Sequence, residues 1–183
     1  YESLAERCQR PLDDDIMSSL LRARESDGSP FPEDEIRNCM LLLFVAGLDT
    51  VTSTMTYIWR YLARTPAARR YLSEHLNDRS KLNSAVDELF RINAVSNIYR
   101  RVAKNVDYKG ITLRMDEKVV MPNTVANRDP RVFENPEVID LNRKLNAHLT
   151  FGLGPHRCLG SHLAKAEVIV ALQEWLRLIP DFQ

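Results

Sequence analysis

The chain has 183 residues, and its 25 Lys and Arg residues balance 25 Asp and Glu residues, so its formal net charge is +0 at pH 7. This balance gives no global positive field and argues against a nucleic acid or an anionic membrane as partner. The three cysteines are an odd number without the spacing of a disulfide framework or a metal-binding pair, which is typical of a reducing cytosol. We therefore expect a cytoplasmic protein.

A long helix is the main element that the first half of the sequence predicts. Before it, residues 4–24 carry a helical pattern interrupted by a proline, which indicates two short helices with a loop. The long helix covers residues 33–64, with acidic residues in its first turn and Pro66 after its end. Its middle, residues 40–48, is apolar almost all round, so we expect burial on all sides in the core. This run is far shorter than the roughly 20 residues of a membrane span, so we expect no span.

The second half of the sequence combines further helices with short strands and a long loop. Helical patterns predict helices over residues 66–76, 81–91 and 159–178, the last of which is ended by Pro180. Residues 122–150 are rich in Pro, Asn and Asp, and we expect a functional loop there. A small sheet is expected from four strand-like segments, residues 101–103, 106–108, 111–113 and 119–121.

The ends and the continuity of the sequence bear on its domain organisation. No internal repeat and no Pro/Gly/Ser linker divides the chain, so we expect residues 1–183 to belong to a single domain. The chain begins at Tyr1, inside a helical pattern, without a methionine or a visible signal peptide. We therefore expect an internal fragment of a longer protein.

Residues 151–160, with the sequence FGLGPHRCLG, carry the most specific chemistry. Cys158 lies at the end of a glycine-rich turn, directly before a predicted helix whose first turn offers N–H groups and a positive dipole end to a thiolate. This arrangement holds a thiolate against a flat metal cofactor, so we expect Cys158 to bind haem iron. Phe151 would shield the sulfur, and His156 could donate to a haem propionate. The glycines that permit unusual φ values and close approach of a planar ligand are Gly152, Gly154 and Gly160.

A polar segment inside the long apolar helix is the second chemical feature. Gly47, Asp49 and Thr50 lower helix propensity and would desolvate polar groups in a buried helix, so a compensating role is expected. Thr50 can bond back to the Ala46 carbonyl and distort the helix, which would open a groove for dioxygen and water. The plainer alternative is a kink with a solvent-facing Asp49, just as Cys158 could be an inert buried cysteine.

Together these residues resemble the cytochrome P450 superfamily, the haem-thiolate monooxygenases, and especially its soluble bacterial members of the camphor hydroxylase type. The Phe, Gly, basic, Cys and Gly positions of residues 151–160 form a long signature with several independent constraints. The resemblance implies a mainly α fold with a small β-sheet, the C-terminal half of the cytochrome P450 fold. It also implies that the N-terminal helices, which roof the substrate pocket, and the terminal β-hairpin are absent from this chain.

The resemblance implies catalytic and haem-binding roles for the matching residues. Cys158 would be the axial ligand of the iron in haem b. Asp49 and Thr50 match the acid–alcohol pair of the family's oxygen-activating helix, in which Thr50 would hold the oxygen species and an ordered water while Asp49 relays protons. Residues 127–130 resemble the bacterial pattern that positions the chain before the cysteine loop. Further haem contacts are expected from Ala46 and Gly47, together with the residues of the cysteine turn named above.

Four arginines and a glutamate are implied to support the haem. Glu88 and Arg91 match a motif that forms a buried structural network with Arg143, although an ordinary surface ion pair is the commoner outcome of this spacing. Counting back from Lys109 and Gly110, Arg100 falls on the propionate-binding arginine of the family. An arginine suits this role because its planar guanidinium matches a carboxylate. Arg101 is the alternative, one residue away.

The implied reaction inserts one oxygen atom from O2 into an unactivated C–H bond of a small, mainly apolar substrate of terpenoid size. Because the sequence holds no flavin or iron–sulfur motif, electrons would come from a small acidic ferredoxin with its reductase. Arg157 and Lys165 could form a basic patch for this donor. The expected substrate contacts are Leu42, Val45, Val95 and Ser96.

Other functions remain open from the sequence. A haem-binding sensor or carrier would use the same thiolate turn, but it has no need of Asp49 and Thr50 in a buried helix. A peroxide-driven enzyme would work without a reductase. The isolated 183 residues could also fail to hold haem, because half of the expected haem pocket is missing.

Overall fold

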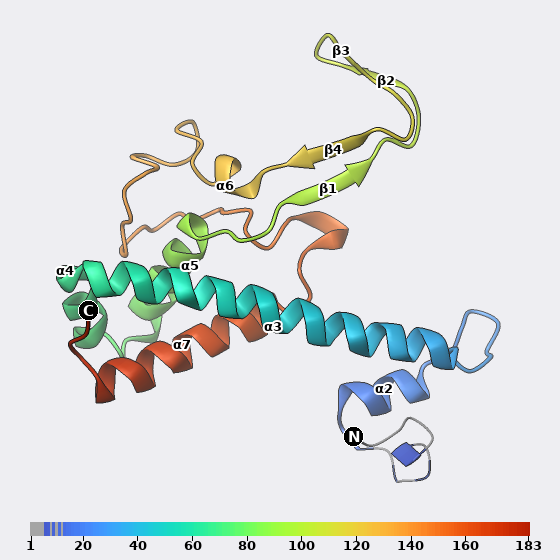
Figure 1. The fold of residues 1–183 in the computed structure, drawn as a ribbon, viewed down its shortest axis with the longest axis horizontal. Helices are drawn as coiled ribbons and strands as arrows, with labels where there is room; N and C mark the ends of the chain where they lie inside the picture. The colour runs from blue at the N-terminus through green and yellow to red at the C-terminus, as the bar shows by residue number, and fades with distance from the viewer. Residues whose placement is uncertain (1–5, 8, 10, 12) are drawn as a thin grey trace. The chain divides into compact units, whose positions relative to one another are not determined.

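The computed structural model describes residues 6, 7, 9, 11 and 13–183. This part of the chain is mainly helical with small antiparallel sheets, which confirms the expected fold class (Figure 1). Contacts divide the chain into two compact units, Tyr1–Asp49 and Thr50–Gln183, and each is described by itself. The assignment of the whole chain to a single domain stays a prediction.

The first unit contains helix α2 and the first half of helix α3. Helix α2, Ile16–Arg22, begins after Asp15, whose carboxylate accepts a hydrogen bond from the Ser18 amide at 2.6 Å. This cap satisfies an N–H group at the helix start that would otherwise lack a partner, and it lowers the pKa of Asp15. The first of the two short helices expected from the sequence falls largely outside the described residues.

Helix α3, Glu33–Arg64, has the predicted bounds and runs unbroken through Gly47 and Thr50. The prediction that its middle is buried on all sides is wrong, because Leu42 and Phe44 are 67% and 66% exposed. Apolar side chains are buried only where another element covers them, and no described element covers this stretch. The other large apolar residues exposed here are Leu41, Val45 and Leu48.

Helix α3 is also, among the described residues, the one helix long and apolar enough to cross a membrane. Length and composition are weak grounds by themselves, since the core helix of a soluble protein passes the same test. The absence of a membrane span, expected from the short apolar run, stays a prediction.

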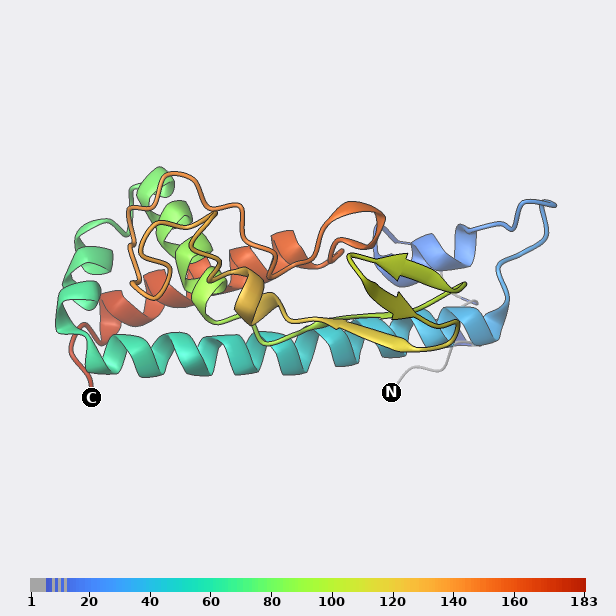
Figure 2. The ribbon, with the colours of Figure 1, turned by 90° about the horizontal axis from the view of Figure 1, so that it is seen from above.

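The second unit is organised around one apolar core between helices. Helices α4, Pro66–Glu74, α5, Arg79–Ile92, and α7, Ser161–Leu178, enclose this core with the C-terminal part of α3, as Figure 2 shows. All three helices match the predicted ones to within a few residues. Trp59 of α3 packs against Trp175 of α7, with ring centroids 5.8 Å apart. The fully buried apolar side chains of this core include Ile58, Leu62, Leu72, Leu89 and Leu172.

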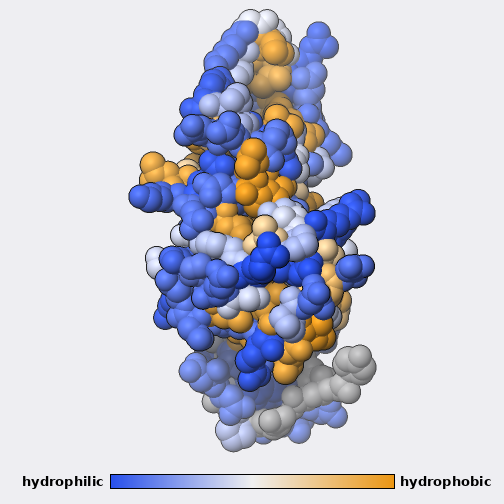
Figure 3. Space-filling view, turned by 90° about the vertical axis from the view of Figure 1, so that its left-hand side faces the viewer, coloured by the Kyte–Doolittle hydropathy of each residue, from blue (hydrophilic) through white to orange (hydrophobic). Residues whose placement is uncertain are grey.

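The strands form two separate antiparallel pairs instead of one small sheet. Strand β1, Ile98–Arg101, pairs with β4, Lys118–Met121, and strand β2, Val106–Tyr108, pairs with β3, Ile111–Leu113. Lys109 and Gly110 have φ values of 51° and 81°, which suit the two-residue turn of the β2–β3 hairpin. Apolar side chains are exposed on these strands too, and Figure 3 shows apolar patches among hydrophilic residues on one face of the molecule.

The segment from Pro122 to Thr150 is loop-rich, as predicted, apart from the short helix α6, Asn123–Ala126. It returns the chain to the core helices, where Leu141 and Phe133 are buried. A single 3-10 turn, η1, Gly154–His156, precedes α7. The loop therefore places the cysteine turn, residues 151–160, directly before the N-terminal end of α7.

Candidate functional site

The cysteine turn, residues 151–160, is fixed by its glycines and by backbone hydrogen bonds. Gly152 and Gly154 have φ values of 71° and 72°, a region that favours glycine. The Cys158 amide donates to the Phe151 carbonyl at 2.8 Å and closes the turn. Gly160, at the N-cap of α7, has an ordinary φ of −80°, so its backbone conformation does not require glycine.

The sulfur of Cys158 lies at the N-terminal end of α7. Cys158 is exposed, and a Cβ atom added at Gly160 would lie 4.0 Å from its Sγ atom. A helix N-terminus favours the thiolate, because its N–H groups and dipole stabilise negative charge. A Cβ atom at Gly154 would meet nothing within 4 Å, so the surface beside the turn is open. An exposed Cys158 beside an open glycine surface fits an iron-bearing planar group. Cys158 is not buried in the described chain, and its role as the iron ligand stays a prediction.

Phe151 and His156 occupy different surroundings within the turn. The half-buried Phe151 ring packs edge-on against Phe90 of α5, with centroids 4.9 Å apart, and lies 5.9 Å from the His148 ring. His156 is exposed in the 3-10 turn. The expected roles of Phe151 as a shield of the sulfur and of His156 as a propionate donor stay predictions.

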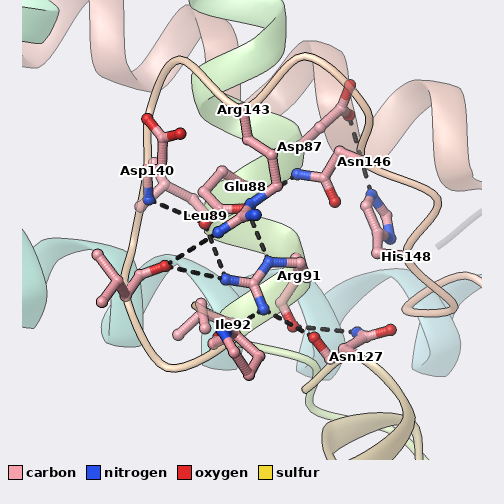
Figure 4. Close-up of polar contacts among 12 residues, drawn as sticks. Asp87, Glu88, Leu89, Arg91, Ile92, Asn127, Asp140, Arg143, Asn146 and His148 are labelled. Atoms are coloured by element: carbon pink, nitrogen blue, oxygen red, sulfur yellow. Dashed lines mark hydrogen bonds and ion pairs between the residues drawn. The ribbon is translucent and has the colours of Figure 1, made fainter. Parts of the chain in front are cut away.

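Glu88, Arg91 and Arg143 lie together beneath the loop (Figure 4). The side chains of Glu88 and Arg91 are 0% exposed. Arg91 Nε donates to Glu88 Oε2 at 2.7 Å, and Arg91 Nη2 donates to Oε1 at 2.8 Å, so the pair is bidentate. Arg143 Nε donates to the same Oε2 atom at 3.0 Å. The structure thus brings the three residues together, while their contribution to haem incorporation stays a prediction.

The guanidinium of Arg91 uses every donor it has. Besides its two bonds to Glu88, Nη1 donates to the carbonyls of Asn127 at 2.7 Å and Pro136 at 2.8 Å. Nη2 donates to the Val138 carbonyl at 3.2 Å. Complete pairing offsets the large cost of burying a charge. Arg91 therefore ties helix α5 to three points of the loop.

The Glu88 carboxylate is equally well paired. It also accepts hydrogen bonds from the Asp140 amide at 2.9 Å and from Asn146 Nδ2 at 3.0 Å. Burial raises the pKa of Glu88, but hydrogen bonds from Arg91, the Asp140 amide and Arg143 lower it by a larger amount. The net pKa therefore lies below the ordinary value of 4.5. Glu88 is therefore ionised at neutral pH.

Asn127 links α5 to the segment directly before the cysteine turn. This fully buried side chain donates to the Arg91 carbonyl at 3.0 Å and to Thr150 Oγ1 at 2.9 Å, and it accepts from the Leu149 amide at 2.7 Å. Thr150 Oγ1 in turn donates to the Phe90 carbonyl at 2.8 Å. The sequence indicates that residues 127–130 position the chain, and these contacts show how Asn127 does so.

The alternation of strand β1 separates the two propionate candidates. Arg100 lies on the same face as Ile98, because side chains alternate along a strand. Ile98 Cδ1 is 3.7 Å from where a Cβ atom at Gly152 would lie, so this face is turned toward the cysteine turn. Arg101 lies on the other face, with Nη1 3.7 Å from Asp116 Oδ1. The guanidinium of Arg100 donates to the Tyr99 carbonyl at 2.8 Å, and its role at a propionate stays a prediction.

The polar segment of α3 is exposed, contrary to the buried setting expected for it. Asp49 and Thr50 are both exposed, and a Cβ atom at Gly47 would meet nothing within 4 Å. Thr54 Oγ1 donates to the Thr50 carbonyl at 2.8 Å, a back-bond of the kind expected between Thr50 and Ala46. Burial cannot explain these residues in the described chain, because no element covers them. Their catalytic roles stay predictions.

The expected substrate and electron-donor residues differ in their surroundings. The exposed side chains of Leu42, Val45, Val95 and Ser96 are all accessible to a ligand. Arg157 is exposed as well, whereas Lys165 Nζ lies 2.8 Å from the Asp87 carboxylate. Neither Asp87 nor His148, which lies beside it, has a recognisable signal in the sequence.

Comparison with known proteins decides the family. The sequence profile of the family Cytochrome P450 matches residues 1–178. The chain belongs to the cytochrome P450 family. It is 38% identical to a probable cytochrome P450 127A1 of Sinorhizobium fredii, over 92% of this chain and 40% of that protein. It is 34% identical to the biotin biosynthesis cytochrome P450 of Bacillus subtilis, over 99% of this chain and 45% of that protein.

Solved structures of cytochromes P450 resemble this chain closely. The crystal structure of CYP101J2 matches with a TM-score of 0.87 at 32% identity, covering 97% of this chain and 44% of that one. CYP109E1 of Bacillus megaterium in complex with corticosterone matches with a TM-score of 0.86 at 34% identity, covering 98% of this chain and 48% of that one. The chain therefore spans less than half the length of these relatives.

Proposed function

We propose that the protein to which this chain belongs is a haem-thiolate monooxygenase that inserts one oxygen atom from O2 into a small, mainly apolar substrate. The observation that carries the proposal is the Cys158 sulfur, exposed at the N-terminal end of α7 in a turn that Gly152 and Gly154 shape. When bound, a thiolate-ligated haem supplies dioxygen activation. The protein's share is to hold the haem, orient the substrate and control protons.

The residues around the turn would hold haem b. Cys158 Sγ would bind the iron at the N-terminal end of α7, whose N–H groups and dipole favour a negatively charged ligand atom. Arg100 and His156 would donate to the propionates, and the place of Arg100 on the face of β1 that carries Ile98 supports its part. Phe151, held by Phe90, would keep water from the sulfur. The small residues that let the ring approach the backbone are Ala46, Gly47, Gly152, Gly154 and Gly160.

Asp49 and Thr50 would control protons at the oxygen-binding side. The Thr50 hydroxyl would hold an ordered water, and the Asp49 carboxylate would exchange protons between that water and solvent. The exposure of Asp49 supports this relay, because a carboxylate that exchanges protons with solvent must be accessible. Proton assistance of this kind contributes about 10²–10⁴-fold in rate.

The substrate is proposed to be an apolar molecule of terpenoid size. Leu42, Val45 and Val95 supply apolar contacts, and Ser96 supplies one hydroxyl. Among similar proteins, one is named mycinamicin IV hydroxylase/epoxidase, and CYP109E1 was solved with corticosterone. These names describe those proteins, and they support only the coarse class of a bulky organic substrate here.

The electron donor is proposed to be a ferredoxin that docks near Arg157 in the cytoplasm. Lys165 contributes less to a basic patch than Arg157 does, because Asp87 compensates its charge. Changing Arg157→Glu should weaken ferredoxin binding and flatten its salt dependence. Unchanged affinity and salt dependence in this variant would remove the patch from the proposal.

The thiolate is tested with the reduced carbon monoxide spectrum of the full-length protein. The wild type should show the red-shifted Soret band of thiolate-ligated haem, and Cys158→Ser should lose it. Cys39→Ser is the matched control, because Cys39 is the other free cysteine among the described residues and should leave the band unchanged. A red-shifted band that survives Cys158→Ser contradicts Cys158 as the iron ligand. A wild-type protein that contains no haem supports the alternative that this protein does not bind haem.

Oxygen chemistry is distinguished from haem sensing or carriage by Thr50→Ala. A monooxygenase with this substitution should divert reducing equivalents from substrate oxidation to hydrogen peroxide. The measurement is the ratio of product to electron donor consumed, compared with Thr52→Ala two residues further along α3. Unchanged coupling in Thr50→Ala would refute the proton-control role.

A further inference from the structure

Asp87 stands next to Glu88 on helix α5, and its contacts bracket the cysteine turn. We propose that Asp87 is a positioning residue that holds the turn from both ends, through His148 before it and Lys165 after it. The inference rests on the proposed function only for the importance of the sulfur's position. It adds a second anchor to the one that Glu88 and Arg91 provide.

The contacts of Asp87 reach two separate segments of the chain. Lys165 Nζ of α7 lies 2.8 Å from the Asp87 carboxylate. On the other side, His148 Nε2 lies 4.0 Å from Asp87 Oδ1, as Figure 4 shows for these two residues. The Thr150 amide donates to His148 Nδ1 at 3.3 Å, so in the neutral ring the proton sits on Nε2 and faces Asp87. The side chain of His148 is 9% exposed, which leaves the imidazole little alternative partner in water.

The two neighbouring carboxylates of α5 hold different parts of the loop. Glu88 binds the earlier part, at the Asp140 amide, Arg143 and Asn146. Asp87 faces the later part, at His148, and the helix that follows the turn. The turn also contacts α5 through the packing of Phe151 against Phe90, and Asp87 adds a polar link from α5 to the helix that follows the turn.

The carboxylate of Asp87 is suited to this role because it is charged. Burial raises its pKa, but the nearby His148 ring and the hydrogen bond from Lys165 lower it by a larger amount, so the net pKa lies below the ordinary value of 3.8. An ionised carboxylate forms stronger hydrogen bonds to a cationic partner than a neutral group does. Replacing Asp87 with Asn keeps the shape and removes the charge.

A cavity beside the turn shows why polar contacts are needed. The cavity has a volume of about 300 Å³ and is lined by residues of the turn, α5 and α7, among them Asp87, His148, Gly152, Arg157, His162 and Lys165. Asn146 also lines this cavity, and its Oδ1 atom is buried without a hydrogen-bond partner among the described residues. Phe151 packs against Phe90 at the start of the turn, but dispersion forces do not act across the cavity itself, because they need atoms in contact. Asp87, His148 and Lys165 lie together in the wall of this cavity, where their polar contacts join α5 to the segments on either side of the turn.

The first test measures hydrogen exchange in the full-length protein, with or without haem. In Asp87→Asn, the backbone amides of residues 151–160 should exchange about tenfold faster, as expected from loss of a charge-assisted contact. Amides of α5 and the urea midpoint of unfolding should stay near wild type. Asp87→Glu should restore most of the protection. Glu174→Gln is the matched control, since it removes another carboxylate–cation pair on α7 without touching the turn.

The second test measures ligation by the Cys158 sulfur in the haem-loaded protein. Asp87→Asn should lower the share of the thiolate-type Soret band in the reduced carbon monoxide spectrum, and Asp87→Glu should recover it. A role in general stability alone would not produce this spectral change in a folded variant. If Asp87→Asn does not fold, Lys165→Met removes only the α7 contact and should give the same two changes at smaller size.

The outcomes separate this inference from the proposed function. Exchange of residues 151–160 that is unchanged in Asp87→Asn and Lys165→Met, or that rises equally in Glu174→Gln, overturns the positioning role. A wild-type protein without the thiolate band refutes the proposed function, whereas the exchange experiment still decides the role of Asp87. Faster exchange confined to the turn, together with rescue by Asp87→Glu, supports it.

Discussion

The buried network around Glu88 and the apolar stretch of α3 from Leu41 to Leu48 differ in what surrounds them. Glu88 and Arg91 carry full charges and are 0% exposed, because every donor of Arg91 meets an acceptor. Leu42 and Phe44 are apolar and lie mostly in contact with solvent. Hydrophobicity alone therefore does not decide which of these side chains is buried, and the partners that the fold supplies matter as well.

The same contrast separates the residues that hold the cysteine loop from the residues proposed to contact the substrate. The network that carries the cysteine loop is complete within the second unit, since all its members lie between Glu88 and Thr150. The proposed substrate-contacting residues of α3 lack a cover among the described residues. The support of the cysteine can therefore be tested independently of the surface that would contact a substrate.

The largest effect is expected from breaking the buried pair. Glu88→Gln leaves the Arg91 charge buried without a counter-charge, which should lower the free energy of unfolding by about 3–5 kcal/mol. Glu174→Gln removes an exposed Glu–Arg pair of the same i,i+3 spacing and should cost at most about 1 kcal/mol. Urea unfolding followed by circular dichroism measures both. Equal losses would show that the burial of the network does not matter.

A smaller effect is expected from Asn127→Ala. The substitution removes three hydrogen bonds that tie α5 to the chain before the cysteine turn and leaves the Leu149 amide without its acceptor. We expect a loss of about 2–3 kcal/mol in the free energy of unfolding, the usual cost of unpaired buried polar groups. Asn38→Ala, at an exposed position of α3, should change stability by no more than about 0.5 kcal/mol.

The charge of Glu88 should also appear in the pH dependence of stability. Its folded-state pKa lies below the ordinary value of 4.5, so the stability it contributes is present above that pH and is lost as the pH falls through the folded-state pKa. Glu88→Gln mimics the protonated side chain. The stability difference between wild type and Glu88→Gln should therefore shrink from neutral pH to about pH 3. A difference that stays constant with pH would contradict an ionised Glu88.

The smallest effect on stability is expected in the exposed apolar stretch of α3. Leu42→Ala in the chain of residues 1–183 should change stability by about 0.5 kcal/mol or less, as at other exposed positions. Leu172→Ala, at a fully buried position of α7, should cost about 2–5 kcal/mol. Thermal unfolding of the two variants compares them. Similar losses at both positions would show that the α3 stretch is covered in solution.

The sequence by itself determined the features that depend on neighbouring residues. The bounds of α3 follow from its acidic first turn and from Pro66, because helix ends are set locally. Gly152 and Gly154 adopt the left-handed φ values that glycine permits. The order of motifs around Cys158 was enough to predict the family, which the comparisons confirm.

Only the tertiary structure decided which of these features are buried and which side chains meet. Glu88–Arg91 and Glu174–Arg177 have the same spacing, yet one pair is buried and the other exposed, because distant loop segments cover only the first. The contact of Asp87 with Lys165 joins residues far apart in sequence and leaves no local pattern. Burial depends on what the rest of the chain places nearby, and that information is absent from any single stretch of sequence.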